Sequence, residues 1–446
     1  MFDQLYARRL KADLATWVEN GWVSSDAAGR ILASLDKGTG RSRLPAVLAM
    51  VGVICLALAV AAFVAANWEA IPRLVKLVGI VVAVVGANLL AAWAAHAGRR
   101  TIAELATVFA VMVFVSGLAL VGQIYHLPTD WAGGAVLATL GALAAAWLTG
   151  SRPAQLVAAV AAITWVFMRP EPNAGADLDV GATLYGLALI VALGVHAIVW
   201  PSRPGRWATL ILLFCVYGRI AAESGFFDVE FDVMVAIAAL AAALIAWGLV
   251  LYRRAEYAPA TWLRRDGISL FARSALDVGA AVLTGTVVVT LVYILSDTPT
   301  AVPFLYVLSV PPITVVAALA LAGILVALAG SEGRSEAIAV AAAAAIGFAC
   351  PLFAITMPNQ PVLHAALALV AALAVSVAGI LAGFSFWSVV GHLGVAAVVL
   401  WLLNITIGTL IGQSVFFLVA GAVLIGVAWA SARLMRRRAA VRGEAS

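Results

Sequence analysis

Two short motifs place polar and aromatic side chains together in an otherwise apolar chain. The first runs Ala-Ala-Asn-Trp-Glu over residues 65–69, and the second is Gly-Gln-Ile-Tyr-His at residues 122–126. Their amide, carboxylate, phenol and imidazole groups could bind a polar solute through hydrogen bonds and charge. With a nearby arginine, they define a candidate polar site on the predicted outer face of a membrane. Its members are Asn67, Trp68, Glu69, Arg73, Gln123, Tyr125 and His126.

The first motif also has an explanation that needs no function. Trp68 suits the interface between a bilayer and water, and Pro72 suits the first turn of a helix. Glu69 and Arg73 are one helical turn apart, so they can pair with each other. A tight turn between two membrane spans is therefore an alternative interpretation, and the sequence leaves both open.

Residues 308–312, Leu-Ser-Val-Pro-Pro, interrupt another apolar stretch. Pro311 and Pro312 have no backbone N–H, so carbonyls of the preceding turn lose their donors. Broken helices of this kind line binding sites in transporters, and they also occur as simple kinks. We treat Pro311 and Pro312 as a candidate broken helix. The lack of a matching break elsewhere in the sequence favours the kink.

Ionisable and amide groups inside apolar stretches are the remaining candidates, because placing them in lipid is costly. Arg219 and Glu223 are one helical turn apart, and we expect them to neutralise each other rather than bind a substrate. A second set lies deeper in the spans, where its members could hydrogen-bond between helices or line a hydrated path. This set is His196, His392, Asn88, Gln123 and Gln155.

Sequence signatures of the common catalytic classes do not occur. The chain has no Walker-type phosphate loop, kinase signature, His-Glu-x-x-His motif or nucleophile elbow, which disfavours ATP coupling and the familiar hydrolases. Its 3 cysteines and 5 histidines are scattered, so we expect no metal site, no cofactor and no catalytic residue. Basic residues flank the apolar runs instead of forming a patch, so nucleic acid is not an expected partner.

The elements that carry these residues are predicted to be membrane-spanning helices. Of the 446 residues, 64% are hydrophobic and 11% are charged, which is more apolar surface than a soluble core can bury. Apolar runs of about 20 residues recur along the chain, and this length crosses a bilayer as a helix. We predict an all-α polytopic transmembrane bundle with about 14 spans, or 12–14 because three are short. The predicted spans are 44–66, 74–95, 103–125, 132–149, 153–168, 180–200, 207–224, 231–252, 275–296, 303–329, 336–356, 362–382, 386–403 and 408–430.

The distribution of positive charge predicts the orientation of these spans. All but four of the 27 Lys and Arg residues fall on one side of the membrane when the number of spans is even. Cytoplasmic segments are the ones enriched in these residues, so both termini are predicted to be cytoplasmic, N-in and C-in. The exceptions are Arg73, Lys76, Arg169 and Arg219. We expect a multi-pass protein of the bacterial cytoplasmic (inner) membrane.

Residues 1–43 are predicted to form a cytoplasmic helical hairpin before the bundle at 44–430 and a basic tail at 431–446. Asn20-Gly21 should end the first helix, because Gly tolerates a left-handed conformation, and Ser24 or Ser25 should cap the second. The first long apolar run begins only at Leu44, so we expect no cleavable signal peptide and a first span that acts as a retained anchor. The hairpin either only fixes topology, or residues 1–40 dock on lipid or on a cytoplasmic protein partner.

Three features together are similar to a family of predicted bacterial membrane proteins, domain of unknown function 2157. They are a hairpin with Trp17 and Asn-Gly-Trp-Val at 20–23, Ala-Ala-Asn-Trp-Glu at 65–69, and Gly-Gln-x-Tyr-His at 122–126. The resemblance covers the chain up to about residue 150. It implies a multi-span inner-membrane protein of unsettled activity, and it supplies no catalytic residues.

Two functions of different classes follow from these observations. The leading hypothesis is secondary transport or flipping of a small or lipidic solute, because many packed spans and a broken helix suit a path across the bilayer. The alternative is a non-transporting scaffold or sensor that recruits a cytoplasmic partner through the N-terminal hairpin. An enzyme acting on lipid comes third, since it would need clustered acids and bases that the sequence does not show.

Overall fold

The computed structural model describes most of the chain as helix. The described residues are 13–14, 17–30, scattered positions between 48 and 66, and then 72–126, 128–170, 179–223, 230–257, 265–296, 301–329 and 334–406. The chain divides into two compact units, residues 1–116 and 117–446. Each unit is therefore described by itself.

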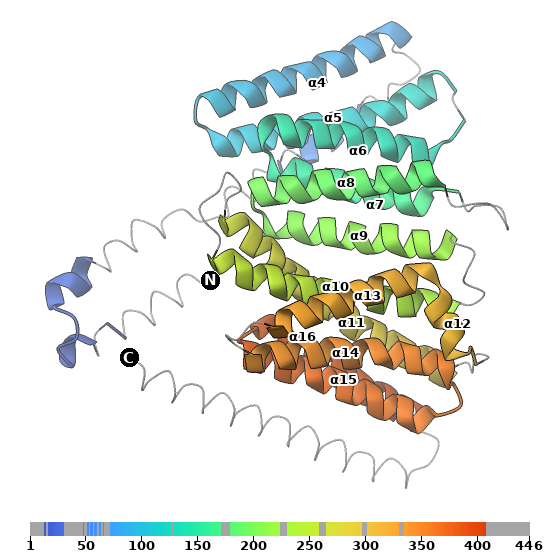
Figure 1. Ribbon diagram of the computed structural model, residues 1–446. Coiled ribbons are helices and arrows are strands. Elements are labelled where there is room, and N and C mark those ends of the chain that lie inside the picture. The colour runs from blue at the N-terminus through green and yellow to red at the C-terminus, as the bar shows by residue number, and fades with distance from the viewer. Residues whose placement is uncertain are drawn as a thin grey trace. The chain divides into compact units, whose positions relative to one another are not determined.

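All regular elements among the described residues are helices (Figure 1). The first unit contains α4 and the beginning of α5, and the second contains the end of α5 and all later helices. Their bounds are α4 Arg73–His96, α5 Arg100–Ile124, α6 Trp131–Thr149, α7 Arg152–Met168, α8 Val180–Val199, α9 Arg203–Glu223, α10 Glu230–Tyr257, α11 Arg265–Ser296, α12 Phe304–Ser309, α13 Pro311–Ala329, α14 Arg334–Thr356, α15 Pro361–Ala382 and α16 Ser385–Thr406.

Eleven helices in the described part of the chain are long and apolar enough to cross a membrane. A further apolar helix, α7, has 17 residues and is about 26 Å long at the rise of an α-helix, slightly short of a bilayer core. These helices lie at the predicted second to thirteenth spans. The span at 44–66 is only partly described, and the one at 408–430 lies outside the described residues. The chain is an all-α polytopic membrane protein, while the total number of spans and their orientation stay predictions.

Two helix boundaries differ clearly from the predicted spans. The span expected at 275–296 belongs to α11, which already begins at Arg265, and α10 continues to Tyr257 instead of ending at residue 252. The apolar runs predict only the segment of each helix that crosses lipid. A helix does not need apolar residues to continue, because its backbone hydrogen bonds form equally well outside lipid. The ends of α10 and α11 therefore extend past their apolar segments.

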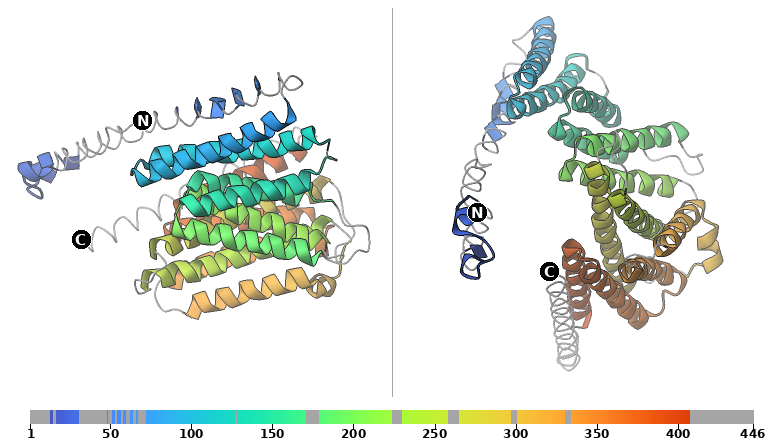
Figure 2. Two further views of the ribbon diagram at one scale, coloured as in Figure 1. Left: turned by 90° about the horizontal axis from the view of Figure 1, so that it is seen from above. Right: turned by 60° about the vertical axis from the view of Figure 1, so that its left-hand side comes forward.

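The centre of the second unit is formed by α10 and α11. Within their apolar segments, 72% and 67% of the residues are buried. The two helices pack on each other, α10 also contacts α13 and α14, and α11 contacts α14, α15 and α16. In Figure 1 they lie between the layer of α6–α9 and the layer of α14–α16, and the right-hand view of Figure 2 shows the same order.

Small residues allow the central helices to approach closely. A Cβ atom on Gly279 of α11 would lie 2.9 Å from Cγ1 of Ile245 and 3.1 Å from the carbonyl oxygen of Ala241, both on α10. Such contacts are tighter than side chains tolerate, so this position needs glycine. Packing of this kind replaces the hydrophobic effect as the force between helices in lipid.

Helices α6–α9 form a second packed group, in which α6 contacts α7, and both α7 and α8 contact α9. Polar side chains cap the N-termini of α6, α7 and α8. Asp130 accepts from Gly133 N at 2.7 Å at the start of α6, Ser151 accepts from Ala154 N at the start of α7, and Asp179 begins α8. Each cap satisfies a backbone donor that the helix leaves free. Gly150, with φ of 65°, ends α6 in the left-handed conformation.

The N-terminal hairpin is described over residues 17–30. A helix ends at Asn20-Gly21, where Gly21 has φ of 72°, and a second helix begins at Ser25. Ser24 Oγ accepts a hydrogen bond from Ala27 N at 3.3 Å. The predicted left-handed stop and the predicted serine cap are both confirmed.

Candidate functional site

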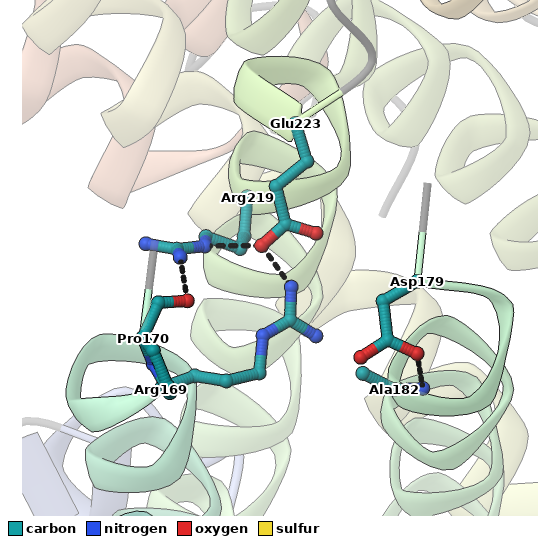
Figure 3. Close-up of polar contacts among 6 residues, drawn as sticks. All are labelled: Arg169, Pro170, Asp179, Ala182, Arg219 and Glu223. Carbon is teal, nitrogen blue, oxygen red and sulfur yellow. Dashed lines mark hydrogen bonds and ion pairs between the residues drawn. The ribbon is translucent and has the colours of Figure 1, made fainter. Parts of the chain in front are cut away.

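A buried cluster of three charges joins the ends of α7 and α9. Glu223, the last residue of α9, has a side chain that is 4% exposed. Its Oε1 accepts from the guanidinium of Arg219 on the preceding turn and from Nη2 of Arg169, which follows α7. Figure 3 shows both guanidinium groups converging on this one carboxylate oxygen. We call Arg169, Arg219 and Glu223 the charged cluster.

Local structure fixes both arginines. The backbone N–H of Arg169 donates to the carbonyl of Trp165 as the last turn of α7 closes, and its guanidinium lies 5.5 Å from the centre of the Trp165 ring. Nη2 of Arg219 donates to the carbonyl of Pro170 at 2.8 Å. The end of α9 is thus bound to the end of α7 through charge and a backbone carbonyl, while the Trp165 ring of α7 holds the Arg169 side chain.

A small pocket opens beside the charged cluster. Its cavity has a volume of about 10 Å³, room for about one water molecule. Helices α7, α8 and α9 all contribute to its wall, which combines apolar side chains with the two arginines of the cluster. Its lining residues are Trp165, Val166, Arg169, Ala182, Thr183, Val216, Arg219 and Ile220.

Two oxygen atoms near this pocket are buried without a hydrogen-bond partner in the structure. One is Oε2 of Glu223, the second oxygen of the shared carboxylate, and the other is the hydroxyl of Thr183 in the pocket wall. The nearby carboxylate of Asp179 is an acceptor like Oε2 of Glu223, and it caps α8 by accepting from Ala182 N at 3.0 Å (Figure 3). Both atoms keep hydrogen-bonding capacity that no described side chain uses.

The side chains of the pocket wall offer two guanidinium groups and one hydroxyl to a polar group. The carboxylate of the charged cluster is already held by two cations, and no histidine or thiol lies in the pocket wall. Among the described residues, no group of three or more His, Cys, Asp or Glu side chains is placed to hold a metal ion. Guanidinium and hydroxyl donors at the pocket suit phosphate or carboxylate oxygens.

Sequence reasoning found only part of this cluster. The pairing of Arg219 with Glu223 is confirmed, because the two are one turn apart on α9. The partner it missed is Arg169, which is 54 residues away from Glu223 in the chain. One sequence signal connects Arg169 with Arg219. Both are among the four basic residues predicted on the outer side of the membrane, so they are predicted at the same end of the bundle.

The residues of the predicted outer-face site are described only in part. Asn67, Trp68 and Glu69 lie outside the described residues, and Arg73 is the first residue of α4 in the first unit. In the second unit, Gln123 lies in the last turn of α5 and is exposed, as is Tyr125. His126 is exposed and has φ of 49°, the left-handed conformation that closes α5. The two groups belong to different units, so their joint site stays a prediction.

Comparison with known proteins supports the N-terminal resemblance. Residues 15–155 match the family model described as Predicted membrane protein (DUF2157). The N-terminal part of the chain carries this domain. The match contains both polar-aromatic motifs and ends within α7, so the charged cluster lies beyond it. No curated protein and no solved structure matches the chain.

The candidate broken helix at Pro311 and Pro312 is the boundary between α12 and α13. Val310 has an extended conformation between the two helices and is 1% exposed. Its carbonyl accepts from the hydroxyl of Thr314 at 2.9 Å, and the Pro312 carbonyl accepts from the hydroxyl of Tyr217 at 2.6 Å. These two carbonyls have partners within the protein, and so does the Val307 carbonyl, which loses its donor to Pro311 and accepts from Val310 N at 3.3 Å.

The deeper polar residues mostly hydrogen-bond between helices. Gln155 of α7 donates to the Leu193 carbonyl of α8 at 3.0 Å, and Nε2 of His196 lies 3.1 Å from the Ala146 carbonyl of α6. His392 of α16 contacts the hydroxyl of Ser376 on α15 at 3.0 Å. Asn88 instead donates to the Val84 carbonyl of its own helix. Interhelical hydrogen bonding thus explains three of these residues.

Proposed function

We propose that this integral membrane protein moves a small or lipidic solute across a bacterial cytoplasmic membrane by secondary transport or flipping. The polar group of the solute is received at the pocket beside the charged cluster. The sequence predicts this end of α7, α8 and α9 to be the outer one. We infer a lipidic solute with an anionic head, whose charge would face the guanidinium groups of Arg169 and Arg219 beside this small pocket.

The observation that supports this proposal is the burial of the charged cluster beside an open pocket. A buried ion pair contributes little net stability to a protein, because desolvation of the charges offsets their attraction. Ionisable groups within membrane segments are therefore functional candidates by default. Here the unpaired hydroxyl of Thr183 adds a hydrogen-bond donor that the protein itself does not use.

Exposed apolar side chains next in sequence to the pocket wall are compatible with a lipidic solute. Phe167 on α7 is 67% exposed and Leu184 on α8 is 61% exposed. A lipid could place its head against Arg169 and Arg219 while its acyl chains lie on these exposed side chains. A small polar solute would gain nothing from such contacts.

Flipping in reconstituted vesicles tests the proposal. Purified protein in phosphatidylcholine vesicles should accelerate exchange of a fluorescent phosphatidylglycerol between leaflets, measured by chemical quenching of the outer leaflet. Arg169→Gln and Arg219→Gln should each slow this exchange. The control is Arg334→Gln, because Arg334 is exposed and lies at the predicted opposite end. Equal rates for protein-free, wild-type and variant vesicles would reject flipping of this lipid.

One observation favours the scaffold alternative. Trp22, in the turn of the N-terminal hairpin, is 74% exposed, whereas Leu14 of the same hairpin is 1% exposed. A large exposed aromatic side chain on a folded turn is a typical anchor for a partner protein or a membrane surface. Removing residues 1–40 separates the two functions: a scaffold would lose its partner in an affinity purification, whereas a transporter that still inserts would keep its flux.

A further inference from the structure

A second group of arginines lies at the opposite end of α9 from the charged cluster. Arg203 is the first residue of α9, and Arg206 follows one turn later. Both lie at the end that the charge distribution predicts to be cytoplasmic. Arg203 is exposed, while Arg206 is only 6% exposed.

Arg206 is a buried cation with no acidic partner among the described residues. Its Nε donates to the hydroxyl of Ser274 on α11 at 2.9 Å, and that hydroxyl donates in turn to the Leu270 carbonyl. None of the ion pairs in the described part of the chain includes Arg206. A buried guanidinium normally has a carboxylate or phosphate partner, because an uncompensated charge is costly away from water.

The neighbouring charges do not supply this partner. Arg203 is close enough to Arg206 for the two to repel each other. The one nearby carboxylate, Asp277, is 3.4 Å from Nε of Arg273 and also interacts with the charge of Arg203. Asp277 thus interacts with Arg273 and Arg203, and no described carboxylate is paired with Arg206.

Aromatic rings contact the guanidinium groups of Arg203 and Arg273. The guanidinium of Arg203 lies 5.4 Å from the centre of the Trp207 ring, and Trp207 makes an edge contact with Phe386 at the start of α16. The guanidinium of Arg273 lies 3.7 Å from the centre of the Phe384 ring. The indole N–H of Trp207 is buried without a hydrogen-bond partner. Rigid aromatic contacts of this kind hold the arginines in place before a ligand arrives.

We propose that Arg203 and Arg206, with Ser274 and Trp207, form a binding site for a phosphate group. Two guanidinium groups one turn apart at the start of a helix match the geometry and charge of phosphate oxygens. The phosphate comes from a phospholipid head of the adjacent leaflet or from free phosphate in solution. This site does not depend on the proposed transport function, since it requires binding alone.

Binding to the full-length protein tests the site without any flux measurement. The protein is placed in nanodiscs of phosphatidylcholine alone or with added phosphatidylglycerol, and lipid binding is measured by native mass spectrometry together with the thermal midpoint. Inorganic phosphate added to the phosphatidylcholine nanodiscs is the second arm. A shift with phosphatidylglycerol identifies the lipid as the source, and a shift with inorganic phosphate identifies a free anion.

Matched variants connect the binding to these residues. Arg206→Gln and Arg203→Gln should each weaken binding by about tenfold, because each removes a hydrogen bond between two charged groups. Arg203 is exposed, so the second variant tests the site even where replacement of buried Arg206 impairs folding. The control is Arg152→Gln, since Arg152 is also an exposed first residue of a helix at the predicted cytoplasmic end. Binding of neither probe, or equal binding in Arg203→Gln and Arg152→Gln, would overturn the proposal.

Discussion

Replacing Glu223 with glutamine should destabilise the protein more than replacing either arginine of the charged cluster. The carboxylate accepts from two guanidinium groups, and a hydrogen bond to a charged group contributes about 1.5–3 kcal/mol. Arg169→Gln removes one such bond and leaves Glu223 paired with Arg219, so we expect a loss of about 2 kcal/mol in the free energy of unfolding.

Glu223→Gln removes the charge from both bonds at once and leaves two cations facing each other. Loss of one partner from a fully buried ion pair costs about 3–5 kcal/mol. The side chains of Arg169 and Arg219 keep 13% and 19% exposure, so they can turn partly toward water. We therefore expect the lower end of that range, about 3 kcal/mol.

Reversible unfolding of the purified protein in mixed detergent and lipid micelles measures these differences. Asp26→Asn is the control, because Asp26 and Arg30 form an ion pair with the same helical spacing but with side chains that are 84% and 76% exposed. An exposed pair of this kind should contribute nothing measurable. A Glu223→Gln variant as stable as wild type, or more stable than Arg169→Gln, would refute the idea that one carboxylate holds both arginines.

Two further predictions concern the packing of the second unit. Gly279→Val should lower the free energy of unfolding by about 1–3 kcal/mol, and with it the thermal midpoint, because its Cβ would meet Ile245 and the Ala241 carbonyl of α10. Gly285→Val is the control, because a Cβ at Gly285 would meet nothing within 4 Å. Tyr217→Phe should cost about 1 kcal/mol by removing the hydrogen bond to the Pro312 carbonyl. Unchanged unfolding of either variant would show that the corresponding contact does not hold the helices.

The helices themselves were largely predictable, because long apolar runs and their charged or glycine-containing flanks determine where spans begin and end. The predicted spans at 180–200 and 362–382 differ from α8 and α15 by a single residue at one end. The early start of α11 at Arg265 was missed, since a helix that continues outside lipid leaves no hydropathy signal. The hydropathy pattern predicts the apolar segment of a helix and not the full length of the helix.

The charged cluster shows what sequence reasoning could not reach. Arg219 and Glu223 are neighbours on one helix, so their spacing alone predicts the pair. Arg169 belongs to α7, and only the packing of α7 on α9 brings it to the same carboxylate. The Tyr217 donor at the Pro312 carbonyl is another contact between distant segments. Such contacts depend on tertiary packing, for which one sequence carries no local signal.

Photocrosslinking tests most directly whether the pocket beside the charged cluster receives a lipid head. The wild-type protein is reconstituted with a phospholipid that carries a photoreactive group in its head, and the labelled peptides are identified by mass spectrometry. We predict labelling concentrated at residues 165–169 and 216–220, and its loss in a variant with Arg169→Gln and Arg219→Gln. Labelling spread evenly over the exposed helices, unchanged in that variant, would contradict the account.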